Sequence, residues 1–448
     1  MQNLKKLQNK KIAFLGLGIE NYALIKYLLK NKIKCEITIC DNKTKKELNE
    51  KYNNLNKKNI KLTWQLGKNY NENLEKFDML FRSPGWPIFC QSIQKFLKAK
   101  NHKPKSDILS SPMQLFFEIC PTKNIIGITG TKGKGTTTSL IYKILKVACK
   151  KVWLGGNISI APFGFLDKIK KTDWIVLELS SFQLEDMTIS PQISVITNFY
   201  PEHLAPADSN NPNYHKTLTD YWYAKMNILK WQSKKCSAIL NYKLNITNFK
   251  LNTKAKIIYF KKSELPSKLI GEHNKENIAA AIEVAKIIKI KQKIIKKAIV
   301  NFKGLPHRLE LVRKYQNVKY YDDSFATMPE STIIALKSFN QPIVILLGGA
   351  DKGANFKKLA KEVKNRVKFV VLLKGVATPK IKKELLKVGF KRNDMKLTNN
   401  IKDAVKIAKK KSIAGDIVLL STACASFGMF KNYKERGKLF QNKVKKLK

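Results

Sequence analysis

The chain has 448 residues and a formal net charge of +53, with 86 basic side chains against 33 acidic ones. Its hydrophobic fraction of 44% suffices for packed cores and excludes a disordered chain, and the length predicts two or three domains. Arginine stands only at 82, 308, 313, 366, 392 and 436, so the excess charge is almost wholly lysine. Because sequence-specific DNA readers rely on arginine for contacts to bases, we predict solvated lysine faces and no specific nucleic-acid partner.

The cysteines stand singly, without a C-x-x-C pair, which indicates reduced thiols. The N-terminus leads directly into a strand pattern without an apolar signal segment, and no apolar run approaches the roughly 18 residues that a membrane span requires. The sequence therefore predicts a cytoplasmic protein with no membrane partner.

Residues 11–18, KIAFLGLG, predict a buried strand followed by a glycine turn. A helical pattern follows over residues 21–30, and then a second strand over 36–40 that ends before Asp41. This order is typical of half a nucleotide-binding α/β fold. Asn21 stands where the dinucleotide fingerprint would have a third glycine, so a tight turn of any α/β sheet is an equal alternative on this motif.

A segment rich in Asn, His, Pro and Ser over residues 101–112 predicts a domain boundary. Beyond it, a strand leads into residues 127–138, GITGTKGKGTTT, and a helix follows. Glycines allow close backbone approach, and N–H groups at a helix N-terminus bind anions, so we predict a phosphate loop rather than a mobile one. The predicted phosphate-binding residues are Gly130, Thr131, Lys132, Gly133, Lys134, Gly135, Thr136 and Thr137.

Lys134 is expected to reach the β- and γ-phosphates. Because Gly135 follows it, Thr136 or Thr137 must supply the hydroxyl for Mg²⁺. Glu178 ends a strand, where an acid after a phosphate loop would hold Mg²⁺. Asn157 and His203 also end strand-like segments. Glu202 and His203 terminate the strand that comes next in order after that of Glu178, so Glu178 and His203 can face one cleft.

Lys225 lies in a helical pattern dense with aromatic residues, where a lysine ordinarily extends to solvent; partial burial would instead lower its pKa. Asn274 and Asn277 are three residues apart at a helix start and face the same way, either as ligand contacts or as simple caps. Arg308 offers a planar guanidinium that suits phosphate or adenine.

Strands alternate with lysine-rich helices through the rest of the chain, which predicts parallel sheets covered on both faces. We predict an α/β protein with three domains over residues 1–110, 111–304 and 305–448.

Six segments resemble, in order, motifs of the Mur ligase family: TGTKGKGTT, ELSSFQLE, GEHNKENIAAA, GLPHRLE, DDSFAT and LLSTACASFGMFKNYKERGKLF. The resemblance covers almost the whole chain. It implies an N-terminal Rossmann-like UDP-binding domain, a central P-loop ATPase-like domain and a C-terminal Rossmann-like α/β domain. It also implies an ATP-dependent amide ligase of peptidoglycan precursor synthesis.

Four of the motifs are most similar to those of the glutamate-adding members. The resemblance implies that glutamate, with D-glutamate favoured, is joined to UDP-N-acetylmuramoyl-L-alanine through an acyl phosphate. The segments NFYPEHLAPAD and ATMPEST resemble a variant subgroup that uses L-glutamate, which keeps that alternative open. Folylpolyglutamate synthase is a second alternative, but that family lacks a separate N-terminal UDP-binding unit. We expect a monomer.

The resemblance also implies roles for single residues. The catalytic set is Lys134, Asn157, Glu178, His203 and Lys225, and further ATP contacts are Asn274, Asn277, Arg308 and Asp323. Two Mg²⁺ ions are implied, one at Thr136 and Glu178 and one at His203 and a carbamylated Lys225. The implied substrate contacts are Gly18, Ile19, Asp41, Asn42, Gly85, Asn157 and His203 for the UDP-linked acid, with Thr327, Lys352, Ser426 and Tyr433 for glutamate. The chain departs from the family at Phe325, usually lysine, and at Glu20, usually small and polar.

Overall fold

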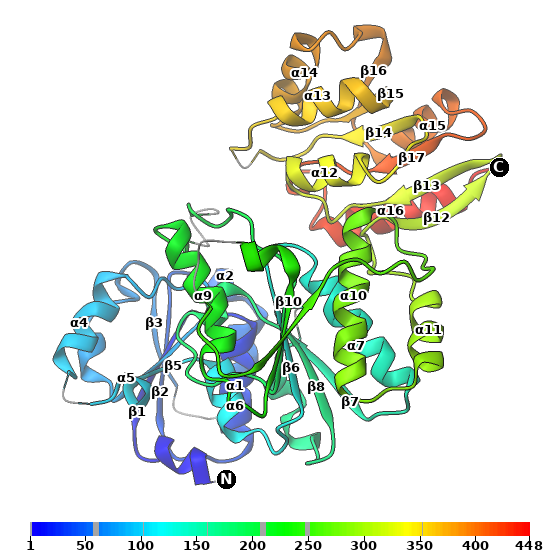
Figure 1. Cartoon of the computed structure of the whole chain (residues 1–448). Coiled ribbons are helices and arrows are strands. Elements are labelled where there is room, and N and C mark those ends of the chain that lie inside the picture. The colour runs from blue at the N-terminus through cyan, green and yellow to red at the C-terminus, as the bar shows by residue number, and fades with distance from the viewer. Residues whose placement is uncertain are drawn as a thin grey trace. The chain divides into compact units, whose positions relative to one another are not determined.

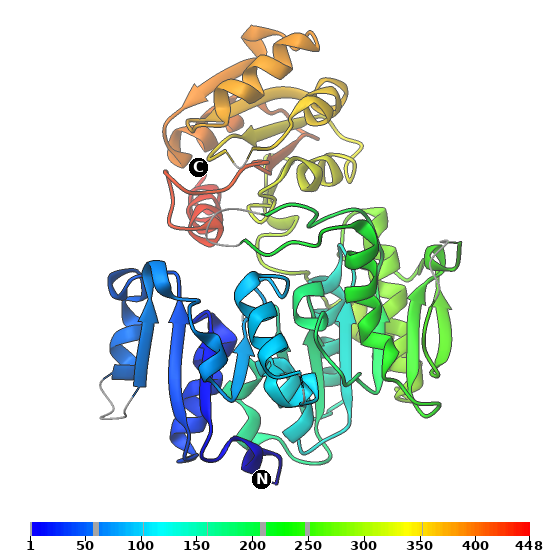
Figure 2. The ribbon, with the colours of Figure 1, turned by 90° about the vertical axis from the view of Figure 1, so that its left-hand side faces the viewer.

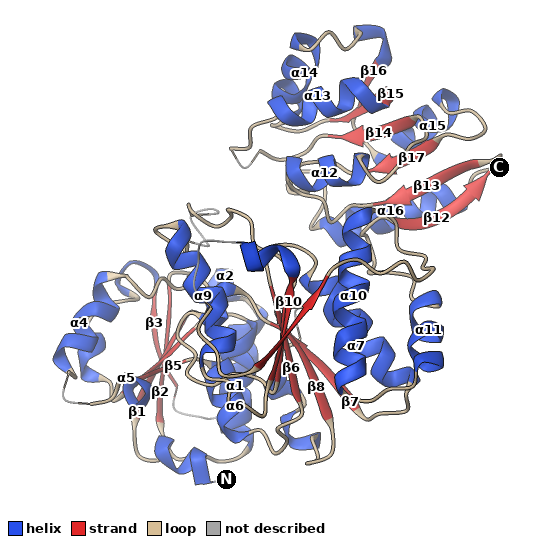
Figure 3. Cartoon of the chain, in the orientation of Figure 1, coloured by secondary structure: helices blue, strands red, loops and turns tan. Residues whose placement is uncertain are grey.

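The computed structural model describes residues 2–56, 62–101, 103–158, 160–206, 212–246, 251–351 and 353–448. Three sheets fall into two compact units (Figures 1 and 3). The first unit comprises Met1–Glu264 and Glu276–Ile299, and the second comprises Leu265–Lys275 and Val300–Lys448. The predicted α/β class is confirmed. Among the described residues, none of the helices is both long enough and apolar enough for a membrane span.

The first sheet is parallel and has the strand order β3-β2-β1-β4-β5. The order reverses at β1, and open α/β sheets bind ligands beyond the carboxyl ends of the strands at such a point. The strands are β1 (Lys11–Leu15), β2 (Glu36–Asp41), β3 (Leu62–Leu66), β4 (Met79–Arg82) and β5 (Leu109–Ser110). The helices are η1 (Gln2–Leu7), α1 (Ile19–Lys30), α2 (Lys45–Leu48), α3 (Glu50–Asn56), η2 (Gly67–Asn69), η3 (Leu74–Lys76), α4 (Gln91–Ala99) and α5 (Lys105–Ile108).

The second sheet is also parallel, with the order β11-β10-β9-β6-β8-β7. All residues of β6 are buried, as expected of a strand covered on both faces. The strands are β6 (Ile125–Thr129), β7 (Val152–Gly156), β8 (Trp174–Glu178), β9 (Ile193–Ile196), β10 (Ser237–Asn241) and β11 (Lys256–Phe260). The helices are α6 (Pro112–Ile119), α7 (Lys134–Val147), η4 (Pro162–Gly164), η5 (Leu166–Lys168), α8 (Ser181–Leu184), α9 (Leu218–Lys230), η6 (Tyr242–Ile246), α10 (Glu272–Ile287) and α11 (Gln292–Val300).

These two sheets share one hydrophobic core within the first unit. Phe116 of α6 packs edge-on against Phe163, and Tyr27 of α1 contacts the same ring from the first sheet. Figure 2 shows the blue strands of the first sheet beside the cyan and green strands of the second. The expected boundary at residue 110 lies between β5 and α6, and the division into three domains stays a prediction.

The third sheet has the order β12-β13-β17-β14-β15-β16 and differs from the purely parallel arrangement that we expected. β12 pairs antiparallel with β13, because Gln316 and Asn317 form a two-residue turn in which both residues have positive φ. The strands are β12 (Glu310–Tyr315), β13 (Val318–Asp322), β14 (Ile343–Leu347), β15 (Val367–Leu373), β16 (Met395–Thr398) and β17 (Ile417–Leu420). The helices are α12 (Pro329–Leu336), α13 (Lys357–Arg366), α14 (Thr378–Lys387), η7 (Arg392–Asp394), α15 (Ile401–Lys411) and α16 (Tyr433–Lys445).

Candidate active site

The glycine-rich loop connects β6 to α7 in a conformation that only glycine adopts easily. Gly130 has φ +137° and Gly133, which caps α7, has φ +83°. A Cβ atom would lie 2.0 Å from Thr197 Oγ1 at the first position and 2.3 Å from Asn277 Oδ1 at the second. The backbone of the loop therefore approaches its neighbours closely and leads straight into a helix N-terminus, as a phosphate cradle requires.

The segment after β9 holds this loop in place. Lys132 N donates to Asn198 Oδ1 at 2.8 Å, and Thr131 N donates to the Asn198 carbonyl at 3.0 Å. Thr197 Oγ1 donates to the Lys132 carbonyl at 2.6 Å. The loop is thus fixed by its neighbours. Neither Thr197 nor Asn198 was predicted from the sequence, although their position directly after a buried strand was a usable signal.

Two amines converge on the carbonyl oxygen of Gly130, which accepts from Lys134 Nζ at 2.9 Å and from Lys225 Nζ at 2.8 Å. The Lys225 side chain of α9 is buried, with 1% exposed, and its Nζ lies 4.5 Å from the centre of the Tyr221 ring. The alternative interpretation, in which this lysine extends to solvent, is therefore wrong. Burial lowers the pKa of Lys225 well below its usual value, and the charge of Lys134 lowers it further, which favours the neutral amine.

Side chains with oxygen atoms lie at the end of β8 and in the first turn of α7, which follows the neighbouring strand β6. Glu178 ends β8, beside β6, and its Oε1 accepts from Asn157 Nδ2 at 2.8 Å. In the first helical turn after the loop, Thr137 Oγ1 donates to Asn277 Oδ1 at 3.2 Å. Thr136 lies one residue before Thr137 and is 9% exposed.

The strand next in order after that of Glu178 is β9 (Ile193–Ile196), but the expectation that Glu202 and His203 terminate it was wrong. β9 ends at Ile196, and β6 lies between β9 and β8 in the sheet. The chain continues for several residues without regular structure before it reaches His203, which has φ +60°. The tertiary fold, and not a strand end, places this side chain.

His203 lies among aromatic rings and charges. Its ring centre is 5.3 Å from that of Phe182, and its Nε2 is 3.9 Å from Glu202 Oε2. Desolvation by the surrounding groups lowers the pKa of His203 to about 4, against the opposing effect of Glu202, although 45% of the side chain is exposed. Glu202 also pairs with Lys132. The imidazole is neutral at pH 7, the form that binds metal ions.

A second group of predicted residues lines a cavity of about 510 Å³ at the switch point of the first sheet, here called the first-sheet cavity. Residues 16–18, 41–43, 47–51, 70, 83–87 and 212 form its wall, and they include the predicted Gly18, Asp41, Asn42 and Gly85. Asp41 orders the wall, since it accepts from Leu17 N at 2.6 Å and from Lys43 N at 3.0 Å. The predicted Ile19 is 51% exposed and is not among the lining residues.

In the second unit, Asp323 follows β13 and is 7% exposed. Its carboxylate accepts from Ser421 Oγ at 2.7 Å and from Leu309 N at 3.2 Å. Burial raises the pKa of Asp323 to about 7, against the effect of these hydrogen bonds. This carboxyl group is buried and firmly oriented.

Arg308 and Phe325 form a stacked pair. The guanidinium carbon lies 3.7 Å from the ring centre of Phe325, and that ring contacts Tyr433 edge-on at 5.1 Å. The aromatic residue that replaces the usual lysine therefore supports the arginine through its ring face and neighbours a predicted glutamate contact.

Ser426 is buried, Thr327 is half-buried, and Lys352 lies outside the described residues. Asn274 Nδ2 donates to the Ile270 carbonyl at 2.7 Å. The ligand contacts that we predicted for these four residues stay predictions.

Arg436 was not predicted from the sequence. It is fully buried, and it donates to Ser324 Oγ at 2.9 Å, the Ser324 carbonyl at 2.8 Å and the Cys424 carbonyl at 3.1 Å. It thereby ties the segment after β13 to the segment that carries Ser426. The residue type could have drawn attention to this position, because arginine is rare in a chain whose basic residues are mostly lysine.

Two family models match the chain. The Mur ligase middle domain covers residues 128–264, and the Mur ligase glutamate ligase domain covers residues 307–424, together more than half of the sequence. The structure is also similar to that of MurF ligase from Thermotoga maritima in complex with ADP. That likeness has a TM-score of 0.57 at 16% identity, covers 100% of this chain and 97% of the other, and shows the fold alone.

Full-length relatives are closer in sequence. The chain is 37% identical to a UDP-N-acetylmuramoylalanine–D-glutamate ligase of Acetivibrio thermocellus, over 98% of this chain and 97% of that protein. It is 36% identical to the ligase of the same name from Clostridium tetani, over 99% and 98%. The family resemblance carried by the motifs is confirmed: this chain belongs to the Mur ligase family.

Proposed function

We propose that this protein is an ATP-dependent ligase that joins D-glutamate to UDP-N-acetylmuramoyl-L-alanine in peptidoglycan precursor synthesis. The observation that carries the proposal is the similarity over nearly the whole chain to proteins named as D-glutamate ligases. Their names also favour the D-isomer over the L-glutamate alternative. The cytoplasmic location and the monomeric state stay predictions.

In this proposal, each of the three sheets belongs to a domain that binds a different part of the reactants. The first-sheet cavity, at a switch point of a parallel sheet, suits the uridine diphosphate moiety. The fixed glycine loop suits the phosphates of ATP. Arg308 and Asp323 are proposed as further nucleotide contacts. Thr327, Ser426 and Tyr433 of the second unit are proposed to contact glutamate, together with Lys352.

The donor set beside the loop fits Mg²⁺. Glu178 offers a buried carboxylate oriented by Asn157, and Thr136 offers a hydroxyl one position from the engaged Thr137. Hard oxygen ligands of this kind are those that Mg²⁺ prefers. When bound, the ion would neutralise charge on the transferring phosphoryl group. A second ion is proposed at His203 and Lys225, where the neutral amine could be carbamylated.

The chemistry has two steps. An oxygen of the substrate carboxylate attacks the γ-phosphorus of ATP, the bond to the bridging oxygen breaks, and ADP leaves with that electron pair. The amine of glutamate then attacks the acyl carbon, and the bond to phosphate breaks after a tetrahedral intermediate, with loss of a proton from nitrogen. Lys134 is placed to offset charge in the first step, and most of the acceleration comes from positioning and electrostatics.

The test is a phosphate-release assay with purified protein, ATP, Mg²⁺ and UDP-N-acetylmuramoyl-L-alanine, offered D- or L-glutamate in separate reactions. We expect release that depends on all three substrates and is faster with the D-isomer. A preference for L-glutamate would establish the variant activity instead. Release with a folate acceptor and none with the UDP-linked acid would reject the proposal in favour of folylpolyglutamate synthase.

A further inference from the structure

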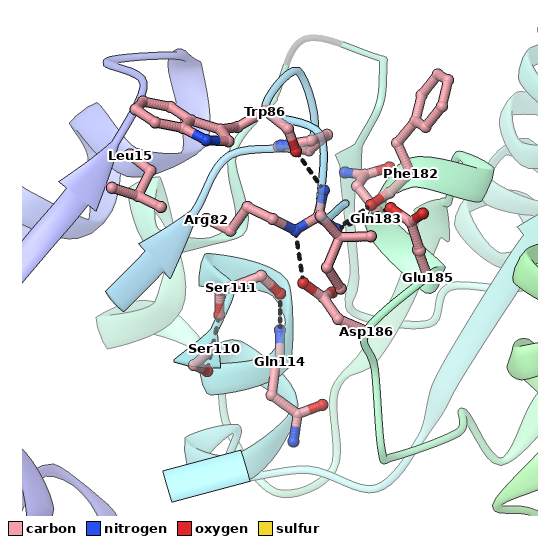
Figure 4. A network of polar contacts seen from close by, with 12 residues as sticks. Leu15, Arg82, Trp86, Ser110, Ser111, Gln114, Phe182, Gln183, Glu185 and Asp186 are labelled. Carbon is pink, nitrogen blue, oxygen red and sulfur yellow. Dashed lines mark hydrogen bonds and ion pairs between the residues drawn. The ribbon is translucent and has the colours of Figure 1, made fainter. Parts of the chain in front are cut away.

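A buried arginine bridges the two sheets of the first unit (Figure 4). Arg82 is the last residue of β4, and its side chain is 1% exposed. Its Nε donates to Asp186 Oδ2 at 2.8 Å, and one terminal nitrogen donates to the Phe182 carbonyl at 2.9 Å and lies 3.3 Å from Glu185 Oε2. The other terminal nitrogen donates to the Trp86 carbonyl at 2.8 Å.

Only arginine can make this set of contacts. The planar guanidinium presents five donors in a fixed fork, so it can bond in three directions at once, whereas a lysine ammonium is a point charge at the end of a flexible chain. A buried cation is tolerated when it is paired and hydrogen-bonded. Burial alone would lower the pKa of Arg82, but Asp186 and Glu185 outweigh burial and raise it, so the side chain stays charged.

One end of the bridge is the wall of the first-sheet cavity. Arg82 directly precedes the segment 83–87, which lines that cavity, and it holds the carbonyl of Trp86 within this segment. Asn213 Nδ2 donates to the Pro84 carbonyl at 2.6 Å and ties the same segment to the stretch before α9. The cavity wall is therefore anchored to elements of the second sheet.

The other end is the α8 turn, which begins three residues after Glu178 and continues into Glu185 and Asp186. The ring of Phe182 stacks on His215 at 4.7 Å and lies 5.3 Å from His203. His215 Nε2 in turn lies 2.9 Å from Ser181 Oγ. The turn that holds Arg82 is thus in contact with the surroundings of the proposed metal ligands.

A second contact runs parallel to the first. Gln183 of the α8 turn donates to Glu20 Oε1 at 2.5 Å, and Glu20 lies in the first turn of α1, close to the cavity residue Gly18. The segment 83–87 of the cavity wall and the start of α1 are therefore joined to the same turn.

We infer that Arg82 is a positioning residue, which holds the first-sheet cavity and the α8 turn at one separation and so aligns the carboxylate of a UDP-linked substrate with the glycine loop. The inference rests on the proposed function. Its physical basis is that binding energy from a remote part of a substrate can be used to orient the reacting centre. For this, the protein must hold the two binding regions at a fixed separation. A misplacement of about 1 Å can lower the rate by roughly 100-fold.

The test uses the full chain with Arg82→Lys, which keeps the charge but loses the fork, and Asp186→Asn, which keeps the shape but loses the anion. The measurements are kcat for phosphate release, KM for the UDP-linked acid and for ATP, the Kd of UDP alone, and Tm. We expect kcat to fall by about tenfold or more in both variants, while KM for ATP and the Kd of UDP change by about twofold or less. If Arg82→Lys does not fold, Asp186→Asn carries the same comparison.

The control is Lys30→Met, which removes the exposed ion pair of Lys30 with Asp167, another link between the two sheets but away from the cavity. All its kinetic constants should match the wild type. A weaker Kd for UDP with unchanged kcat would make Arg82 a binding residue only, and a lower Tm with unchanged kinetics would make it merely structural; either result overturns the inference. An inactive wild type would instead reject the proposed function, so the two failures are distinguishable.

Discussion

At the scale of single residues, the chemistry depends on side chains whose ionisation the fold has shifted. Lys225 shares the Gly130 carbonyl with Lys134, and two ammonium groups on one oxygen repel each other. Burial lowers the pKa of Lys225 and the charge of Lys134 lowers it further, which favours the neutral amine at Lys225. The sequence singled out both lysines, but only the structure shows that they converge on one carbonyl oxygen.

Substitution Lys225→Ala should lower kcat by about 100-fold, a magnitude typical of the loss of one oriented charge stabiliser. Short carboxylic acids such as acetate should restore part of the activity, because they can occupy the space of the carbamate. Phosphate release measured against acetate concentration checks this. Lys230→Ala, an exposed position of the same helix, is the control and should retain full activity. Absence of rescue would argue against a carbamate.

Asp323 predicts a pH effect on stability. Its pKa is about 7 in the folded protein and about 3.8 when unfolded, so the folded state holds a proton that the unfolded state has lost between these values. The contribution of protonated Asp323 to the free energy of unfolding is fully present below about pH 4. It is lost as the pH rises through 7, and the loss amounts to up to about 4 kcal/mol. Asp323→Asn should therefore gain stability relative to the wild type from about pH 5 to pH 8. Urea unfolding at several pH values checks this, and parallel curves would contradict it.

At the scale of elements, the glycine loop shows how one short connection is constrained from several sides. The β6 strand, the α7 helix and the segment after β9 each fix a part of it. The order strand, loop, helix was readable from local pattern, because periodicity and glycine spacing lie close together in the chain. The contacts of Thr197, Asn198 and Asn277 were not, because these residues are distant in sequence.

Gly133→Ala tests this constraint. A side chain at φ +83° costs about 1–2 kcal/mol, and its Cβ would meet Asn277 Oδ1 at 2.3 Å. We expect KM for ATP to rise by about tenfold or more, with a lower Tm. Gly164→Ala is the matched control, since a methyl group there would have no neighbouring atom within 4 Å and the φ of Gly164 is not positive. An unchanged KM for ATP in Gly133→Ala would show that the loop tolerates the rearrangement.

At the scale of the whole molecule, the charge of +53 is a property of the surface and not of a site. The buried arginines at 82 and 436 have structural contacts, while the lysines that carry most of the charge are distributed along the helices. We therefore expect electrostatic attraction to polyanions without sequence preference.

Binding to duplex DNA should be measurable at about 20 mM salt and lost near about 0.2 M, because release of counterions makes such binding steeply salt-dependent. Fluorescence anisotropy with two unrelated duplexes gives the comparison, and both should titrate alike. Phosphate release at the higher salt should remain. Binding that persists there with a preference for one duplex would indicate a nucleic-acid function after all.

The amino-acid sequence alone determined the α/β class, the family and the positions of the glycine loop, Glu178 and Lys225, because these signals are local patterns or ordered motifs. Only the tertiary structure decided that β12 is antiparallel, that His203 lies outside any strand, that Lys225 is buried, and that Arg82 bridges two sheets. Each of these depends on which distant residues become neighbours. Burial, pairing and pKa follow from those neighbours, and no local pattern records them.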